Sequence, residues 1–203
     1  MTKNNNNPKT LANFINCLGV LEDDTARLYK NISMKVEPPI LKSLLLSISE
    51  DSLKHLTLLR GVADSIMKTS EKPRNCDKNT GEIWRLLAKL NKEVDAKKSF
   101  SDEELSEVSR KLAFLESIMG EEYYIFVQLK TLEIMVKEIN QLYHIDLESL
   151  KSVFTHIIND EEHHREIIGT IQSSIGPKQV TGSSPFVKYT NPDNWISHSR
   201  QTT

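Results

Sequence analysis

The stretch NDEEHHREII, residues 159–168, places a run of ionisable side chains inside a strongly apolar helical repeat. Apolar residues continue through its ends at spacings of three and four: Phe154 and Ile157 before it, Ile168 as its last residue and Ile171 after it. The inward positions between them are Glu161 and His164, which a helix brings one turn apart. An ionised carboxylate in an apolar core costs several kcal/mol unless a partner offsets it. A metal ion is the partner that suits a carboxylate and an imidazole at this spacing.

Composition sets broad limits on the class of protein. The chain has 203 residues, a net charge of −2 and a pI near 6.3, so nothing indicates a nucleic-acid partner. It has no run of eighteen apolar residues and no basic leader, and we therefore expect a cytoplasmic protein without a membrane anchor. The two cysteines form no CxxC motif. We expect Cys17 to be a helix thiol and Cys76 a loop thiol.

Apolar residues at spacings of three and four predict an all-α chain. Helices are expected over residues 10–34, 39–68, 82–97, 101 to about 140, and 146–173. Pro39 suits a first helical turn, and Ser101 followed by acidic residues suits a capped helix start. The short links within the first and last pairs of long helices predict antiparallel neighbours.

The connection of about 30 residues between the two pairs suits a ferritin-like four-helix bundle, with a short extra helix in the crossover. We expect the bundle to span residues 10–173. The polar, Asn-rich residues 1–9 and the non-periodic residues 174–203 are expected to be a disordered N-terminus and an extended or disordered tail.

The other three apolar faces are also interrupted by polar residues. Glu22 lies on the first face, His55 on the second and Glu122 on the third. With a rise of roughly 1.5 Å per residue, these positions fall at matching heights with Glu161 and His164. Simpler interpretations stay open. Glu22 can belong to an exposed acidic run, Glu121 can face inward in place of Glu122, and His55 can be a core histidine.

At these residues the chain resembles the ferritin-like superfamily, in particular its rubrerythrin-type bundles. The resemblance covers about residues 10–173 and rests on LEDDTARLY, DSLKH, GEEYY and DEEHH, one from each long helix. It implies a centre of two iron or manganese ions that react with dioxygen or peroxide. Carried over by position, the implied ligands are Glu22, His55, Glu122, Glu161 and His164. The resemblance also implies a homodimer that pairs through outer helix faces.

One position departs from the family pattern. The second helix offers Ser52 where a glutamate is expected three residues before His55, and a hydroxyl is a poor ligand for iron. Asp51 can compensate, although it lies about 100° around the helix from Ser52. Three outcomes stay open: a site for two ions completed by Asp51 or water, a site for one ion of iron, manganese or zinc, and a metal-free cluster of hydrogen-bonded polar groups.

Two functions follow from these alternatives. The first is a metal-dependent oxidoreductase that receives electrons from a separate donor, since the chain has no CxxC motif for a rubredoxin module. The second is a metal-poor helical scaffold that acts through protein–protein contacts, with the segment SPFVKYTNPDNWI as a docking element. A further polar row, His156, Asp160 and His163, is expected to be a solvated face, although Asp160 can hold a ligand histidine in place.

Overall fold

A computed structural model describes residues 8–67, 72–135 and 147–175, and within these ranges the only regular structure is helical. The helices are α1 (Pro8–Ser33), α2 (Pro39–Ile66), α3 (Cys76–Asn79), α4 (Gly81–Asp95), α5 (Asp102–Met135) and α7 (Leu147–Ile175). The predicted all-α class is confirmed. Most of the two predicted tails lies outside the described ranges, but residues 8–9 and 174–175 are helical.

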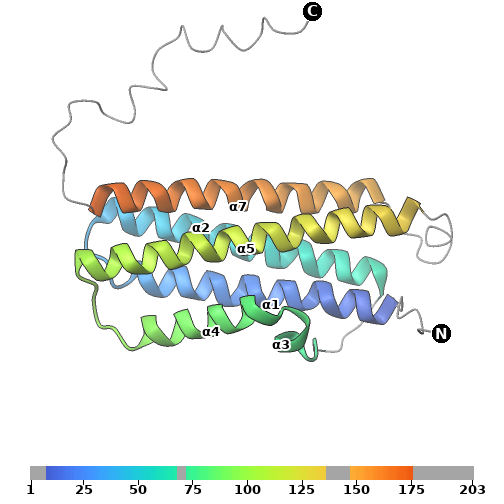
Figure 1. Ribbon diagram of the computed structural model, residues 1–203, viewed down its shortest axis with the longest axis horizontal. Coiled ribbons are helices and arrows are strands. Elements are labelled where there is room, and N and C mark those ends of the chain that lie inside the picture. Colours follow the sequence, from blue (N-terminus) through green and yellow to red (C-terminus); the bar gives the residue numbers. More distant parts are fainter. Residues whose placement is uncertain (1–7, 68–71, 136–146, 176–203) are drawn as a thin grey trace, which may run out of the picture.

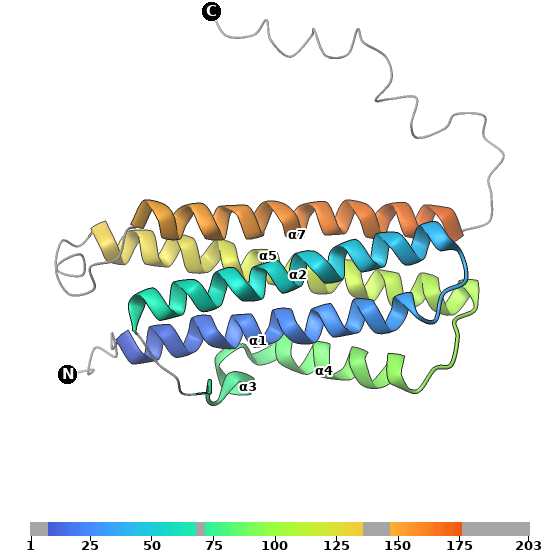
Figure 2. The same cartoon turned by 180° about the vertical axis from the view of Figure 1, so that it is seen from behind.

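The long helices α1, α2, α5 and α7 lie side by side (Figures 1 and 2). α1 and α2 form one antiparallel pair, and α5 and α7 form the other (Figure 1). α2 and α5 run in the same direction, so the chain between them returns along the length of the molecule. α4 makes most of this return and packs against α1 and α5.

Local sequence accounts for where the helices start. Pro39 is the first residue of α2, where its missing N–H and fixed φ cost nothing. Ser101 and Glu104 form a capping box at the start of α5. The Ser101 hydroxyl accepts from the Glu104 N–H at 3.2 Å, and the Glu104 carboxylate accepts from the Ser101 N–H at 3.0 Å. The predicted cap at Ser101 is therefore confirmed, whereas the proposed cap at Asp146 lies outside the described residues.

The apolar faces of the four long helices and of α4 meet in one core. Its largest fully buried apolar side chains include Phe154, Leu18, Leu45 and Leu87, together with the aromatic rings of Tyr29 and Tyr123. None of the helices in the described ranges has the length and apolar character that crossing a bilayer requires.

The expectation of two separate thiols is wrong, because Cys17 and Cys76 form a disulfide with a Cα–Cα distance of 5.1 Å. Asn13, one turn before Cys17, explains how the two meet. Its side chain accepts a hydrogen bond from the Arg74 N–H at 2.9 Å and donates one to the Arg74 carbonyl at 3.0 Å. These bonds hold the segment before α3 against α1.

Candidate metal centre

Five ionisable side chains from the four long helices meet in the middle of the core. They are Glu22 of α1, His55 of α2, Glu116 of α5, and Glu161 and His164 of α7, each at most 1% exposed. Apolar residues surround these positions on every helix, so the cluster is enclosed by core and shielded from water. The two imidazole rings lie next to each other, with centroids 5.9 Å apart.

The five residues form two triads that share Glu161: Glu22, His55 and Glu161, and Glu116, Glu161 and His164. In the first triad, Nδ1 of His55 lies 3.5 Å from a Glu22 oxygen and 3.3 Å from a Glu161 oxygen. In the second, Nδ1 of His164 lies 3.1 Å from Glu116 and 3.9 Å from the other Glu161 oxygen.

These separations suit a metal ion. Donors bonded to one ion at about 2.0–2.2 Å lie roughly 3–4 Å from one another. In addition, four buried atoms of the first triad have no hydrogen-bond partner: Glu22 Oε2, His55 Nδ1 and both carboxylate oxygens of Glu161, the residue that the second triad shares. A buried polar atom without a partner costs about 1–3 kcal/mol, and a bound cation would remove that cost for several atoms at once. The residues present therefore fit one or two divalent ions.

The outer nitrogen of each histidine faces an aspartate from the opposite helix pair. Nε2 of His55 lies 3.1 Å from Asp160 of α7, and Nε2 of His164 lies 3.6 Å from Asp51 of α2. A carboxylate at the outer nitrogen orients the ring and leaves Nδ1 directed toward the cluster. Asp51, expected as a ligand, thus lies at the edge of the centre, where it also pairs with Lys54 at 2.5 Å.

Two buried tyrosines hold carboxylates across the molecule. Tyr29 of α1 donates a hydrogen bond to Glu116 of α5, and Tyr123 of α5 donates one to Glu22 of α1. Burial and the neighbouring carboxylates raise the pKa of both phenols, which therefore remain donors. Each tyrosine fixes Oε1 of its carboxylate. On Glu116 the other oxygen faces His164, whereas on Glu22 the same Oε1 also lies 3.5 Å from His55.

The pKa values of the two neighbouring carboxyl groups Glu161 and Glu116 shift in opposite directions. Burial and the charges of Glu116 and Glu22 raise the pKa of Glu161 well above its usual value. Burial acts on Glu116 in the same sense, but hydrogen bonds from His164 and other neighbours outweigh it and lower the pKa of Glu116. A proton on Glu161 thus relieves the repulsion among three buried carboxylates when no cation is bound.

On α5 the structure places Glu116, not Glu122, in the cluster. Glu122 is partly buried outside both triads, and Tyr123 takes the inward position beside it. Glu116 had not been singled out in the sequence because it directly follows the core residue Leu115. A signal was available, since LEDDTARLY at 21–29 and LESIMGEEY at 115–123 share the pattern L-E-x6-Y. That alignment matches Glu22 with Glu116.

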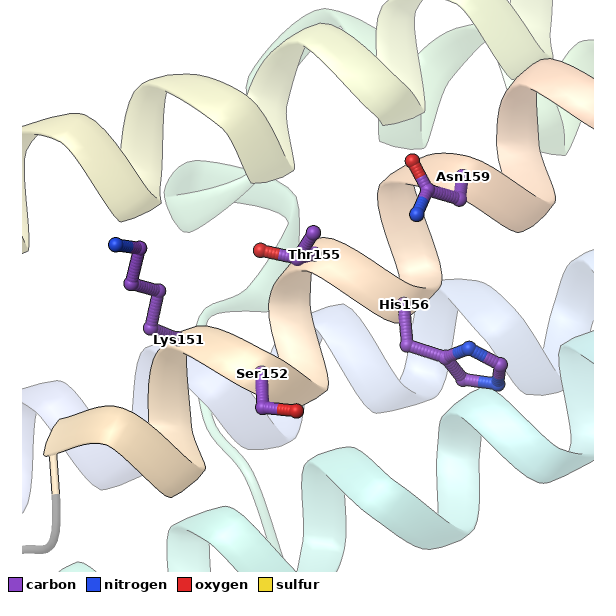
Figure 3. Close-up of a pocket in the computed structure, with 5 residues that line it drawn as sticks. All are labelled: Lys151, Ser152, Thr155, His156 and Asn159. Carbon is purple, nitrogen blue, oxygen red and sulfur yellow. The ribbon is translucent and has the colours of Figure 1, made fainter.

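The outer face of α7 is a separate feature. His156 and His163 are exposed and pair with Asp160 and Glu166 at 3.4 and 3.5 Å. A hollow open to solvent runs along the same helix (Figure 3), lined by Lys151, Ser152, Thr155, His156 and Asn159. Because all its lining residues come from one helix, their polar groups do not converge on a common point.

Comparison of the chain with models of protein families, with curated proteins and with solved structures found no match.

Proposed function

We propose that the chain is a ferritin-like four-helix bundle protein whose buried centre binds one or two divalent ions of iron, manganese or zinc. The observation that carries the proposal is the set of unpartnered donor atoms in two triads that share Glu161. Glutamates from two helices, together with a Glu-x-x-His motif, are the ligand types of carboxylate-bridged metal centres in such bundles. Here Glu116 takes the place that the sequence had assigned to Glu122.

We further propose that the activity is an oxidoreductase reaction with dioxygen or peroxide. A redox-active ion such as iron would supply the electron-transfer chemistry at this centre. The chain's own residues hold and orient the ligands, because Asp160 and Asp51 face the outer histidine nitrogens while the tyrosines hold the carboxylates. The surrounding core excludes water from the centre. Electrons would come from a separate donor, since the chain has no CxxC motif.

Adjacent residues in DEEHH provide matched controls for the test. Glu161 and His164 are buried, whereas the side chains of Glu162 and His163 are 58% and 66% exposed. Purified protein is loaded anaerobically with Fe(II), desalted and analysed for metal. Glu161→Gln, which affects both triads, should lose nearly all bound iron, while Glu162→Gln should keep it. His164→Ala should lose the ion of its own triad, and His163→Ala should bind as the wild type does.

Oxygen or peroxide consumption by the loaded protein then tests the reaction. Consumption that follows the iron content across the four variants supports an oxidoreductase. Absence of bound metal from the wild type after separate loading with Fe(II), Mn(II) and Zn(II) would contradict the metal centre. That result would favour the alternative function, a scaffold that acts through protein contacts, in which Ser52 leaves the cluster without its fourth carboxylate.

A further inference from the structure

The sequence patterns that form the centre occur twice, once in each antiparallel helix pair. The pattern L-E-x6-Y occurs on α1 and α5, and the pattern D-x3-H occurs on α2 and α7. The contacts are reciprocal. Each tyrosine donates to the glutamate of the other pair, and each aspartate faces the histidine of the other pair. An approximate twofold relation therefore connects the two halves, and each side chain has a counterpart.

Ser52 departs from this twofold relation at the counterpart of Glu161, the residue that both triads share. The residue that follows the aspartate is Glu161 on α7 and Ser52 on α2, and both are 1% exposed. Glu161 serves both triads, so its counterpart would be a second carboxylate shared by two ions. At Ser52 the protein instead offers a buried hydroxyl, which can donate a hydrogen bond but carries no charge.

The missing carboxylate changes the charge balance of the centre. Glu22, Glu116 and Glu161 carry three negative charges when ionised, and ligand histidines are neutral. One divalent ion leaves the buried cluster with a net charge of −1, whereas two leave it at +1. An unpaired buried charge is strongly unfavourable. Asp51 and Asp160 offset the +1 charge of the two-ion state only weakly. They lie at the edge with side chains 26% and 30% exposed, and Asp51 is paired with Lys54.

We propose that the centre takes its second divalent ion together with a small carboxylate-type anion from solution, which lies at Ser52 and supplies the missing negative charge. The inference rests on the proposed metal-binding function. The anion class is that of formate, acetate and bicarbonate, whose oxygens match those of the absent glutamate. The Ser52 hydroxyl donates a hydrogen bond to the anion. The first ion needs no anion, since the three glutamates already supply more negative charge than one divalent ion carries.

Calorimetric titration of the metal-free full chain with Co(II), which avoids oxidation during the experiment, tests this inference. In a sulfonate buffer without carboxylates, the wild type should bind one ion per chain, and added formate should allow a second. Ser52→Glu should bind two ions without formate, because it brings its own carboxylate. Ser52→Ala should need about tenfold more formate, the lower range for losing a group that supports a metal ligand.

Ser43→Glu is the matched control, because it adds the same charge on an exposed part of α2 and should keep the wild-type need for formate. If circular dichroism shows that Ser52→Glu does not fold, Ser52→Asp supplies the charge with a shorter side chain. The inference is overturned if the wild type binds two ions without formate, if formate never adds a second ion, or if the folded acidic variant still requires formate. Absence of Co(II) binding under every condition would instead overturn the proposed function.

Discussion

At the scale of single residues, the two tyrosines each hold a carboxylate of the centre by a buried hydrogen bond. Tyr123 is fully buried and donates its hydrogen bond to Glu22, whose second oxygen already lacks a partner. Tyr123→Phe keeps the ring and removes the donor. We expect the free energy of unfolding of the metal-free protein to fall by about 1–3 kcal/mol, and metal affinity to fall about 10–100-fold. Urea denaturation and metal titration measure the two effects, and unchanged affinity would exclude a supporting role.

Proton release on metal binding is a second consequence at this scale. Burial alone would lower the pKa of His55, but the nearby carboxylates of Glu161 and Glu22 outweigh it and raise the pKa to about 11. Burial and neighbouring carboxylates raise the pKa of Glu161 as well. Near neutral pH both side chains therefore hold protons that an ion must displace.

Affinity should consequently rise with pH, by about tenfold per pH unit for each proton released, up to the pKa of His55. Calorimetry in buffers of different ionisation enthalpy counts the protons released per ion. His55→Gln should release fewer protons than the wild type. An affinity that is constant between mildly acidic and mildly alkaline pH would contradict protonation of the metal-free centre.

At the scale of elements, the disulfide ties α3 to α1 and closes a long loop that contains all of α2. Closing such a loop restricts the unfolded chain, and we expect reduction to lower the free energy of unfolding by about 2–4 kcal/mol. Urea denaturation with and without a reductant measures this difference. The double variant Cys17→Ser, Cys76→Ser should be insensitive to the reductant. Equal stability of the wild type under both conditions would contradict a stabilising role for the disulfide.

The helices were predictable from sequence because their apolar residues recur at helical spacing over several turns. α1 begins two residues before the predicted start, and α2 and α7 end within two residues of the predicted ends. The cysteine pair was not predictable, since the two lie 59 positions apart and the Asn13–Arg74 contacts that bring them together leave no local pattern. Glu116 on α5 was not predictable from the apolar spacing, because it directly follows the core residue Leu115 and the repeat is complete without it.

At the scale of the whole molecule, the two triads differ in what they connect. The triad of Glu22, His55 and Glu161 draws on both helix pairs, whereas the triad of Glu116, Glu161 and His164 lies within α5 and α7. Direct packing between α2 and α7 is much less extensive than packing within either pair. An ion in the first triad would therefore connect the two halves of the protein. An ion in the second would mainly hold α5 and α7 together.

Metal-dependent hydrogen exchange should reveal this difference. Binding stabilises the folded state by about 2.7 kcal/mol when free metal exceeds Kd about 100-fold. In the wild type, metal should therefore slow amide exchange in α1, α2, α5 and α7 alike. In His55→Gln, metal can occupy only the second triad, so slowing should be confined to α5 and α7. Each variant is compared with its own metal-free form, which removes any general loss of stability. Metal-dependent protection of α1 and α2 in His55→Gln would show that the two halves are coupled by packing and not by the ion.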